Sequence, residues 1–206
     1  MNRTCITFDE AILRLKRGEA VVFPTDTVAG LGISALHAAS PAVLYAIKDR
    51  PAQKPISWLL PSIDDLFIFG GGISDDAFRL ARAFWPGALT LVVHASANVP
   101  AAFASADGTI GLRVPNHPVP LALMGKDGIE GPLVATSANM SGESDANTLE
   151  DIDARILSQA PWVESPSLKQ AQGLACASTV LDCTEETFSL LREGSISLSE
   201  IEAVLS

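Results

Sequence analysis

AVVFPTDTVAGLGISALHAASPAVLYAIKDRPAQKP, residues 20–55, is the stretch of this sequence that decides the fold. Its apolar start, residues 20–23, predicts a short buried strand that ends at Pro24. A polar turn follows at residues 25–27 (Thr-Asp-Thr), and Gly-Leu-Gly at residues 30–32 predicts a loop that needs a positive φ or a close backbone approach. The stretch therefore predicts hydroxyl groups at a strand end, beside a glycine loop.

The same stretch then predicts a helix with a defined start and end. Ser40 is a suitable N-cap, and Pro41 suits the first helical position. The helix has to end near Pro51, because a residue that precedes proline is disfavoured in the α conformation. Lys48 and Arg50 therefore fall at or just past the last turn, on its polar side. Alone they suggest a solvated helix end, but beside the hydroxyls and glycines they outline an anion site.

Composition limits the class of protein. The 206 residues predict one domain over residues 1–206, and 48% hydrophobic with 18% charged residues suits a compact core. A net charge of −10 argues against general attraction to nucleic acid or an anionic membrane. Three cysteines without ligand-like spacing predict reduced thiols. With no apolar leader or spanning run, we expect a cytoplasmic protein that has no membrane partner.

Strand and helix patterns interleave along the rest of the chain. Short apolar runs predict strands at residues 56–60, 89–94, 109–114, 133–136, 178–182 and 188–192. Capping residues and helical spacing predict helices at residues 7–18, 62–69, 74–85, 118–124, 148–160 and 197–205, with a glycine turn at 70–72. Because the two kinds of element do not alternate strictly, the sequence predicts an α/β protein with a mixed sheet flanked by helices.

Several common site motifs are weak or absent in the sequence. Gly30 and Gly32 match a dinucleotide fingerprint poorly, because they do not directly follow a strand and no acidic strand end comes ~20 residues later. The sequence has no P-loop and no G-x-S-x-G nucleophile elbow. Its three histidines are too scattered to predict a zinc site, so no protein metal ligands are expected.

Arg113 is the most telling charged residue, because it lies within the apolar strand expected at residues 109–114. A charge in that place needs a partner or a ligand. Thr109, four residues earlier on the strand, faces the same side. Arg192 ends the last expected strand, where a surface salt bridge is nearly as good an explanation. Together with the lysine and arginine at positions 48 and 50, these arginines suit a polyphosphate plus a carboxylate.

Taken as a set, the motifs resemble those of the YrdC/Sua5 family across residues 8–200. The matching runs are PTDTVAGLG (24–32), KDRP (48–51), KP (54–55), WPGALTL (85–91), TIGLRVP (109–115), SANMSG (137–142), STVLD (178–182) and LREG (191–194). The resemblance implies a twisted mixed sheet with a large concave face, in the short single-domain form. It also implies L-threonylcarbamoyladenylate synthesis: L-threonine, bicarbonate or CO2, and ATP give threonylcarbamoyl-AMP and pyrophosphate for the t6A37 modification of tRNA.

The resemblance further implies a role for each matching residue. The ATP side comprises Lys48, Arg50, Lys54, Thr109, Ser137, Asn139 and Arg192. Lys48 and Arg50 are the expected catalytic cations among them. The threonine side comprises Thr27, Arg113, Ala135 and Ser178, with Arg113 pairing the substrate carboxylate. Positioning and fixed positive charge are expected to carry catalysis, with Mg²⁺ on the phosphates and no side chain as general base.

Three residues depart from the family pattern and bear mainly on amino-acid specificity. Ala29 replaces an aromatic residue, Leu59 stands where some members have His, and Asp145 replaces a small hydroxyl residue. Two other functions stay open: a non-catalytic module for double-stranded RNA or tRNA, and a paralogue that adenylates a different carbamate. The net charge of −10 weighs against the first of these. The implied partners are tRNA and the downstream t6A transferase complex.

Overall fold

The computed structural model describes residues 4–49, 56–164 and 176–206, and the structural statements below concern this part of the chain. Its strands are β1 (Cys5–Ile6), β2 (Val21–Phe23), β3 (Gly30–Ser34), β4 (Ser57–Leu59), β5 (Gly70–Gly71), β6 (Leu89–Ala95), β7 (Thr109–Arg113), β8 (Leu133–Ser137), β9 (Trp162–Val163), β10 (Thr179–Asp182) and β11 (Ser189–Arg192). Its helices are α1 (Phe8–Leu15), α2 (Ala42–Lys48), α3 (Asp65–Phe69), α4 (Asp75–Phe84), α5 (Pro118–Met124), α6 (Ala154–Leu157) and α7 (Leu198–Leu205). Two 3-10 turns, η1 (Ala101–Phe103) and η2 (Leu149–Asp151), complete the described elements.

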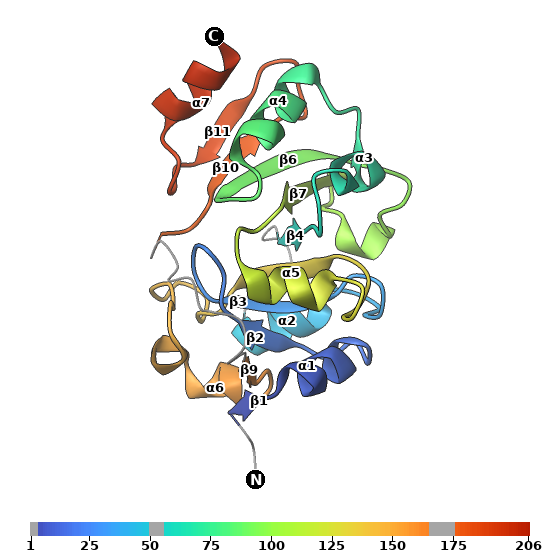
Figure 1. Cartoon of the computed structure of the whole chain (residues 1–206), viewed down its shortest axis with the longest axis vertical. Coiled ribbons are helices and arrows are strands. Elements are labelled where there is room, and N and C mark those ends of the chain that lie inside the picture. Colours follow the sequence, from blue (N-terminus) through green and yellow to red (C-terminus); the bar gives the residue numbers. More distant parts are fainter. Residues whose placement is uncertain (1–3, 50–55, 165–175) are drawn as a thin grey trace.

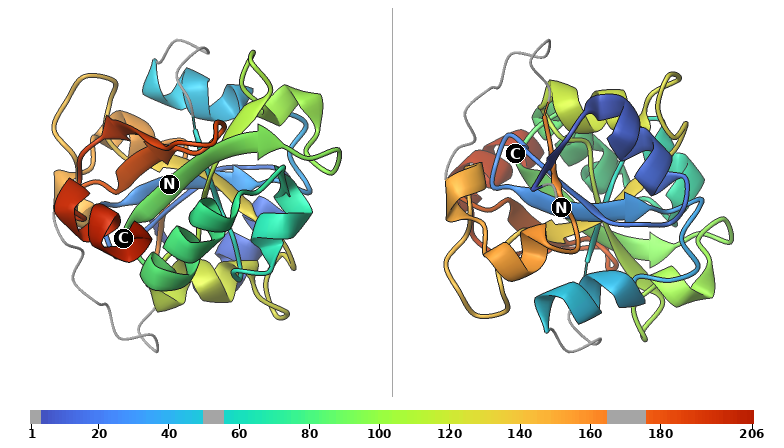
Figure 2. Two further views of the ribbon diagram at one scale, coloured as in Figure 1. Left: turned by 90° about the horizontal axis from the view of Figure 1, so that it is seen from above. Right: turned by 90° about the horizontal axis from the view of Figure 1, so that it is seen from below.

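All these strands belong to one twisted sheet that runs the length of the molecule (Figure 1). The strand order is β1–β9–β2–β3–β8–β4–β7–β6–β10–β11, and β5 pairs with β6 beside this path. The pairs β2–β9, β4–β7 and β6–β10 are parallel, whereas β2–β3, β3–β8 and β6–β7 are antiparallel. Helices lie on both sides of the sheet when the molecule is viewed along its long axis (Figure 2). The predicted α/β class with a mixed sheet is therefore confirmed.

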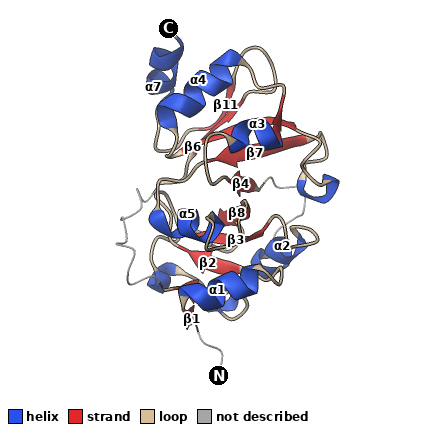
Figure 3. Cartoon of the chain, turned by 45° about the vertical axis from the view of Figure 1, so that its right-hand side comes forward, coloured by secondary structure: helices blue, strands red, loops and turns tan. Residues whose placement is uncertain are grey.

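The apolar run that precedes Pro24 forms β2, a strand buried on both faces. Val21 and Phe23 pack with α1 and α5, whereas Val22 packs into the larger core on the opposite face. A strand covered on both faces is expected to be apolar at every position rather than at alternate ones. Figure 3 shows helices at both ends of the sheet, with α1 at the end nearer the N-terminus and α4 and α7 at the other.

Local capping signals place several helices where the sequence predicts them. Thr7 and Glu10 form a capping box at the start of α1, and Ser197 and Glu200 form another at the start of α7. In both boxes the hydroxyl accepts from the N3 backbone amide and the glutamate accepts from the N-cap amide, so two otherwise unpaired donors are bonded. None of the described helices has the length and apolar character that crossing a bilayer needs.

Four local predictions need correction. The glycine turn expected at residues 70–72 contributes β5, because Gly70 and Gly71 pair with β6. The helix expected over residues 148–160 is divided into η2 and α6, because Asp153 caps a second helix start. The helix after Ser40 begins one residue later than expected, at Ala42. The two-residue strands β1 and β9 were not predicted, because each depends on pairing with distant residues.

The glycine loop expected at residues 30–32 is also wrong, because these residues form the start of β3. Neither Gly30 nor Gly32 has a positive φ. Each instead lies against the ring of Phe23: a Cβ atom would stand 2.8 Å from Phe23 Cε2 at Gly30 and 2.9 Å from Phe23 Cε1 at Gly32. Of the two reasons predicted for these glycines, close approach of a neighbouring group therefore applies and a positive φ does not.

Candidate active site

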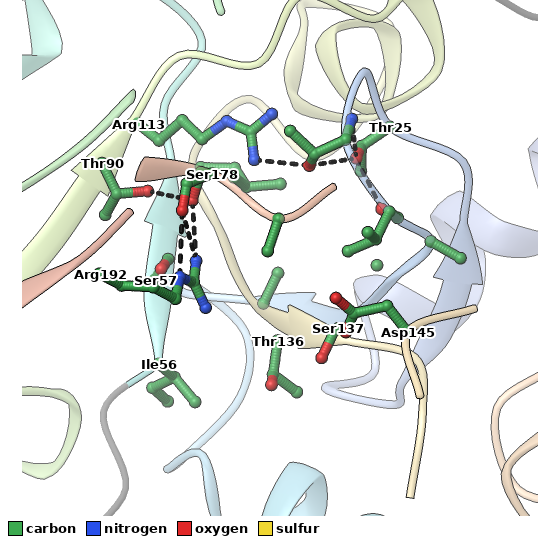
Figure 4. A pocket seen from close by; sticks show the side chains of 17 residues that line it. Thr25, Ile56, Ser57, Thr90, Arg113, Thr136, Ser137, Asp145, Ser178 and Arg192 are labelled. Atoms are coloured by element: carbon green, nitrogen blue, oxygen red, sulfur yellow. Dashed lines mark hydrogen bonds between the residues drawn. The ribbon is translucent and has the colours of Figure 1, made fainter. Parts of the chain in front are cut away.

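A small polar pocket of about 150 Å³ opens where several strands end near the middle of the sheet (Figure 4). Segments distant in sequence line it: the turn after β2, the start of β3, strands β4, β7 and β8, and the segment that leads into β10. Arg192 on β11 and Thr90 on β6 complete the wall opposite the β2–β3 turn. The site is thus an assembly of strand ends, as expected for a ligand site on an open α/β sheet.

Arg113 is the buried cation of this pocket. Its Nη2 donates to Oδ1 of Asp26 at 2.6 Å, and its Nη1 donates to Oγ1 of Thr27 at 2.9 Å. Its Nε donates to the carbonyl oxygen of Gly87 at 2.9 Å. Burial lowers the pKa of Arg113, the Asp26 carboxylate opposes that shift, and the nearby Arg192 adds to it. The sequence therefore predicts correctly that a charge inside this strand requires a partner.

Arg192 forms a second cationic group beside the first. Its Nε and Nη2 donate to the carbonyl oxygen of Ser178 at 3.1 and 2.8 Å, and its Nη2 also lies 3.2 Å from Ser178 Oγ. That hydroxyl is 2.9 Å from Oγ1 of Thr90, a buried residue of β6. Within the described residues Arg192 makes no ion pair, so its charge is available to a ligand.

Lys48 does not line the pocket, but its side chain holds a residue that does. Its side chain is 1% exposed, so it does not lie on the solvated polar side of α2 where the sequence analysis placed it. Its Nζ donates to the carbonyl oxygen of Ser137 and, at 3.2 Å, to Oδ1 of Asn139. Ser137 Oγ in turn donates to the same Asn139 oxygen at 2.5 Å. Lys48 thus fixes the end of β8, where Ser137 lines the pocket, and the turn that follows it.

A larger cavity of about 680 Å³ adjoins the small pocket. Four residues line both cavities: Ile56, Ser57, Thr90 and Arg192. The larger cavity also takes in Thr109, whose hydroxyl donates to Oδ1 of Asp107 at 2.8 Å. Its volume is in the range of about 300–1,000 Å³ usual for ligand pockets, whereas the small pocket lies below that range. The site therefore offers a small subsite and a large one, with Arg192 at their junction.

The predicted site residues gather in this region as far as the structure describes them. Those that line the small pocket are Thr27, Arg113, Ala135, Ser137, Ser178 and Arg192. Thr109 lines the larger cavity, and Lys48 and Asn139 hold the end of β8 that carries Ser137. Arg50 and Lys54 lie outside the described residues. The three residues that depart from the family pattern, Ala29, Leu59 and Asp145, all line the small pocket.

Sequence reasoning missed three residues that shape the site. Asp26 pairs with Arg113, Thr90 positions the Ser178 hydroxyl, and Ser57 lines both cavities. Asp26 and Thr90 lie inside quoted motifs, so a signal for them was present, but nothing in the sequence specified their partners. Among the described residues, no group of three or more His, Cys, Asp or Glu side chains is arranged to hold a metal ion.

Fold and site together define an α/β protein whose twisted mixed sheet carries a two-part cavity with two arginines, Arg113 and Arg192, in its wall. The model of the Sua5/YciO/YrdC family, described as "Telomere recombination", matches residues 14–194. The chain belongs to this family.

Several similar proteins carry names of this family, and some of them are longer than this chain. The threonylcarbamoyl-AMP synthase of Bacillus subtilis is 35% identical over 95% of this chain, which spans 56% of that protein. A putative threonylcarbamoyl-AMP synthase of Mycobacterium leprae is 36% identical over 95% of this chain and 86% of its own length. The solved structure of P. abyssi Sua5 complexed with L-threonine is 30% identical with a TM-score of 0.86, covering 98% of this chain and 60% of that one. The chain thus spans little more than half of the Bacillus and P. abyssi proteins.

Proposed function

We propose that this chain is an L-threonylcarbamoyladenylate synthase, which makes threonylcarbamoyl-AMP and pyrophosphate from L-threonine, bicarbonate or CO2, and ATP. The observation that carries the proposal is the pair of adjoining cavities with Arg192 between them. A small amino acid fits the subsite that contains Arg113, and a nucleotide fits the larger one. The relatives named threonylcarbamoyl-AMP synthase, and the P. abyssi Sua5 structure with L-threonine, support the same assignment.

The reaction needs a site that brings two anions together. The amine of threonine takes up CO2 to give a carbamate, and a carbamate oxygen then attacks the α-phosphorus of ATP. The new O–P bond forms as the bond to pyrophosphate breaks. Arg113 would pair the α-carboxylate, and Arg192 would face the α-phosphate where the cavities meet. In such a reaction orientation and fixed positive charge supply most of the acceleration. We therefore assign no general base.

We propose that Mg²⁺ reaches the site on the phosphates of ATP. Mg²⁺ usually keeps several waters and takes one or two carboxylates in addition to substrate phosphates. Asp107 and Asp182 line the larger cavity, which would hold the ATP phosphates, so their carboxylates are the ones that this chain would offer to a phosphate-bound ion. An Asp182→Asn variant should then need a higher Mg²⁺ concentration for half-maximal pyrophosphate release, with an unchanged threonine KM at saturating Mg²⁺.

The proposed activity is tested by measuring pyrophosphate release from ATP and bicarbonate with each of the twenty amino acids. We expect release with L-threonine, and we expect ¹³C-bicarbonate to label a threonylcarbamoyl-AMP product seen by mass spectrometry. Release with a different amino acid would support the paralogue function, for which Ala29 and Leu59 in the pocket wall would be the first residues to examine. No release with any amino acid would overturn the proposal.

The RNA-binding alternative makes a distinct prediction. A module that neutralises phosphates binds tRNA with a steep salt dependence, whereas an acidic protein of net charge −10 should not. Tight tRNA binding that weakens steeply with salt, without pyrophosphate release, would favour the module. As a synthase, the protein would work in the cytoplasm and supply the complex that transfers the threonylcarbamoyl group to tRNA.

A further inference from the structure

We propose that Asp26 is a positioning residue that orients Arg113 and cancels its charge, so that the small pocket accepts a zwitterion and rejects phosphate. The proposal rests on the proposed function in one respect, because it takes Arg113 as the group that binds the substrate carboxylate. It concerns a residue to which the sequence analysis assigned no role. Asp26 does not line either cavity, so it acts through Arg113 and not on the substrate.

The contact between the two side chains is short and shielded from water. The ion pair joins Arg113 Nη2 to Asp26 Oδ1 at 2.6 Å, and the two side chains are 7% and 11% exposed. A buried charge that loses its partner is strongly destabilised, because solvent cannot replace the lost interaction. Asp26 is therefore needed if Arg113 is to remain charged and buried at the pocket wall.

The hydrogen bonds of Arg113 determine which of its donors can reach a ligand. A guanidinium has five N–H groups, and described residues accept from three of them: Gly87 from Nε, Thr27 from Nη1 and Asp26 from Nη2. One N–H on each terminal nitrogen is left. Because Arg113 lines the pocket and Asp26 does not, the carboxylate holds the guanidinium from behind. These two remaining N–H groups are the ones that would donate to the carboxylate of the substrate.

The charge of the pair determines which anions the pocket attracts. Arg113 and Asp26 together carry no net charge, so they present directional donors without the strong field of an isolated cation. The ATP phosphates occupy the adjoining cavity under the proposed function, and an uncompensated Arg113 would compete with Arg192 for them. Asp26 thus lowers the attraction of the Arg113 subsite for phosphate. It leaves Arg192, which lines both cavities and makes no ion pair within the described residues, as the cation that would hold the polyanion.

Asp26→Asn tests this division of roles. The amide oxygen can still accept from Arg113, but the pocket gains one positive charge. We expect inorganic phosphate to inhibit this variant competitively with threonine about tenfold more strongly than it inhibits the wild type, with the KM for ATP changed less than twofold. Asp26→Ala, which loses both acceptor and charge, should in addition raise the threonine KM about tenfold. Wild-type phosphate inhibition in Asp26→Asn would overturn the proposal.

Controls separate this proposal from folding and from the proposed activity. Asp76→Asn removes a carboxylate from the exposed ion pair with Arg79 and should leave both KM values and phosphate inhibition unchanged. Direct calorimetric titration with inorganic phosphate needs no turnover, so tighter phosphate binding by Asp26→Asn supports the charge role even if threonine is not the substrate. If Asp26→Asn does not fold, Asp26→Glu keeps the charge but displaces the guanidinium. An unchanged threonine KM in that variant would contradict the positioning role.

Discussion

Arg192 and Ser178 are joined by two hydrogen bonds to one atom: Nε and Nη2 of the arginine donate to the serine carbonyl oxygen at 3.1 and 2.8 Å. The planar fork of a guanidinium suits such a double contact, and a lysine ammonium does not reproduce it. The arginine is exposed, yet its orientation at the junction of the two cavities is fixed by backbone. This rigidity makes Arg192 suitable for holding a phosphate that reacts.

Arg192→Lys should therefore lower turnover while leaving the fold intact. The lysine keeps the charge but loses the double contact with Ser178, so the cation is no longer held where the α-phosphate would lie. We expect pyrophosphate release to fall by roughly 10²-fold, the scale for losing one positioned donor. Arg82→Lys on the exposed face of α4 is the matched control and should retain full activity. Wild-type turnover in Arg192→Lys would disprove the role at the junction.

Lys48→Met should lower both stability and turnover. The partly buried acceptors at Ser137 and Asn139 lose a charged donor, which we expect to cost about 1–3 kcal/mol in the free energy of unfolding. The displaced turn should lower pyrophosphate release by roughly 10²–10³-fold. Urea unfolding and the release assay measure the two effects, with the exposed Lys126→Met as control. A loss of turnover at unchanged stability would instead indicate that Lys48 acts directly on the substrate.

Gly30→Ala and Gly32→Ala should each destabilise the protein through contact with the Phe23 ring. The added methyl group would lie 2.8 or 2.9 Å from a ring carbon, closer than van der Waals contact allows. Overpacking of this kind costs about 1–3 kcal/mol, measurable by urea unfolding. Phe23→Leu combined with either substitution should recover part of the loss. Gly71→Ala, whose added Cβ atom meets its nearest neighbour at 3.4 Å, is the control that should change stability least.

The cysteines should differ sharply in alkylation by iodoacetamide. Burial, together with the nearby carboxylates of Asp182 and Asp76, raises the pKa of Cys183 to about 12. Because the thiolate is the reactive form and a raised pKa keeps the thiol protonated, Cys183 should stay unmodified in the native protein at pH 8. The exposed Cys176 should be alkylated under the same conditions. Peptide mass spectrometry after labelling, with a guanidinium-unfolded sample as control, tests this; rapid native labelling of Cys183 would contradict its burial.

Local signals account for the features that the sequence predicted well. The Thr7–Glu10 and Ser197–Glu200 boxes lie within four residues, so each predicts its helix start without knowledge of the rest of the chain. The need for a partner at Arg113 was also visible, because a charge in an apolar strand is costly whatever surrounds it.

Features that depend on distant partners were not predictable in the same way. Gly30 and Gly32 were predicted to form a loop because the side chain that requires glycine at both positions, the ring of Phe23, belongs to the neighbouring strand. The partner of Arg113 is Asp26, which lies 87 residues away along the chain, and no local spacing selects it. Lys48 alone was predicted to be solvated because its acceptors, Ser137 at the end of β8 and Asn139 just after it, lie 89 and 91 residues away along the chain. Motif resemblance brought most of the site residues together, whereas only the coordinates showed which of them contact one another.

The order of strands in the sheet has a consequence for how the protein is made. Strand β10, which follows Ser178, inserts beside β6, and Arg192 comes only at the end of β11. A nascent chain that has left the ribosome up to β8 already contains Asp26, Arg113 and Ser137, but it lacks one wall of both cavities. The site is therefore complete only after β11 has been synthesised, and translation that stops before residue 192 yields a chain without the arginine between the subsites.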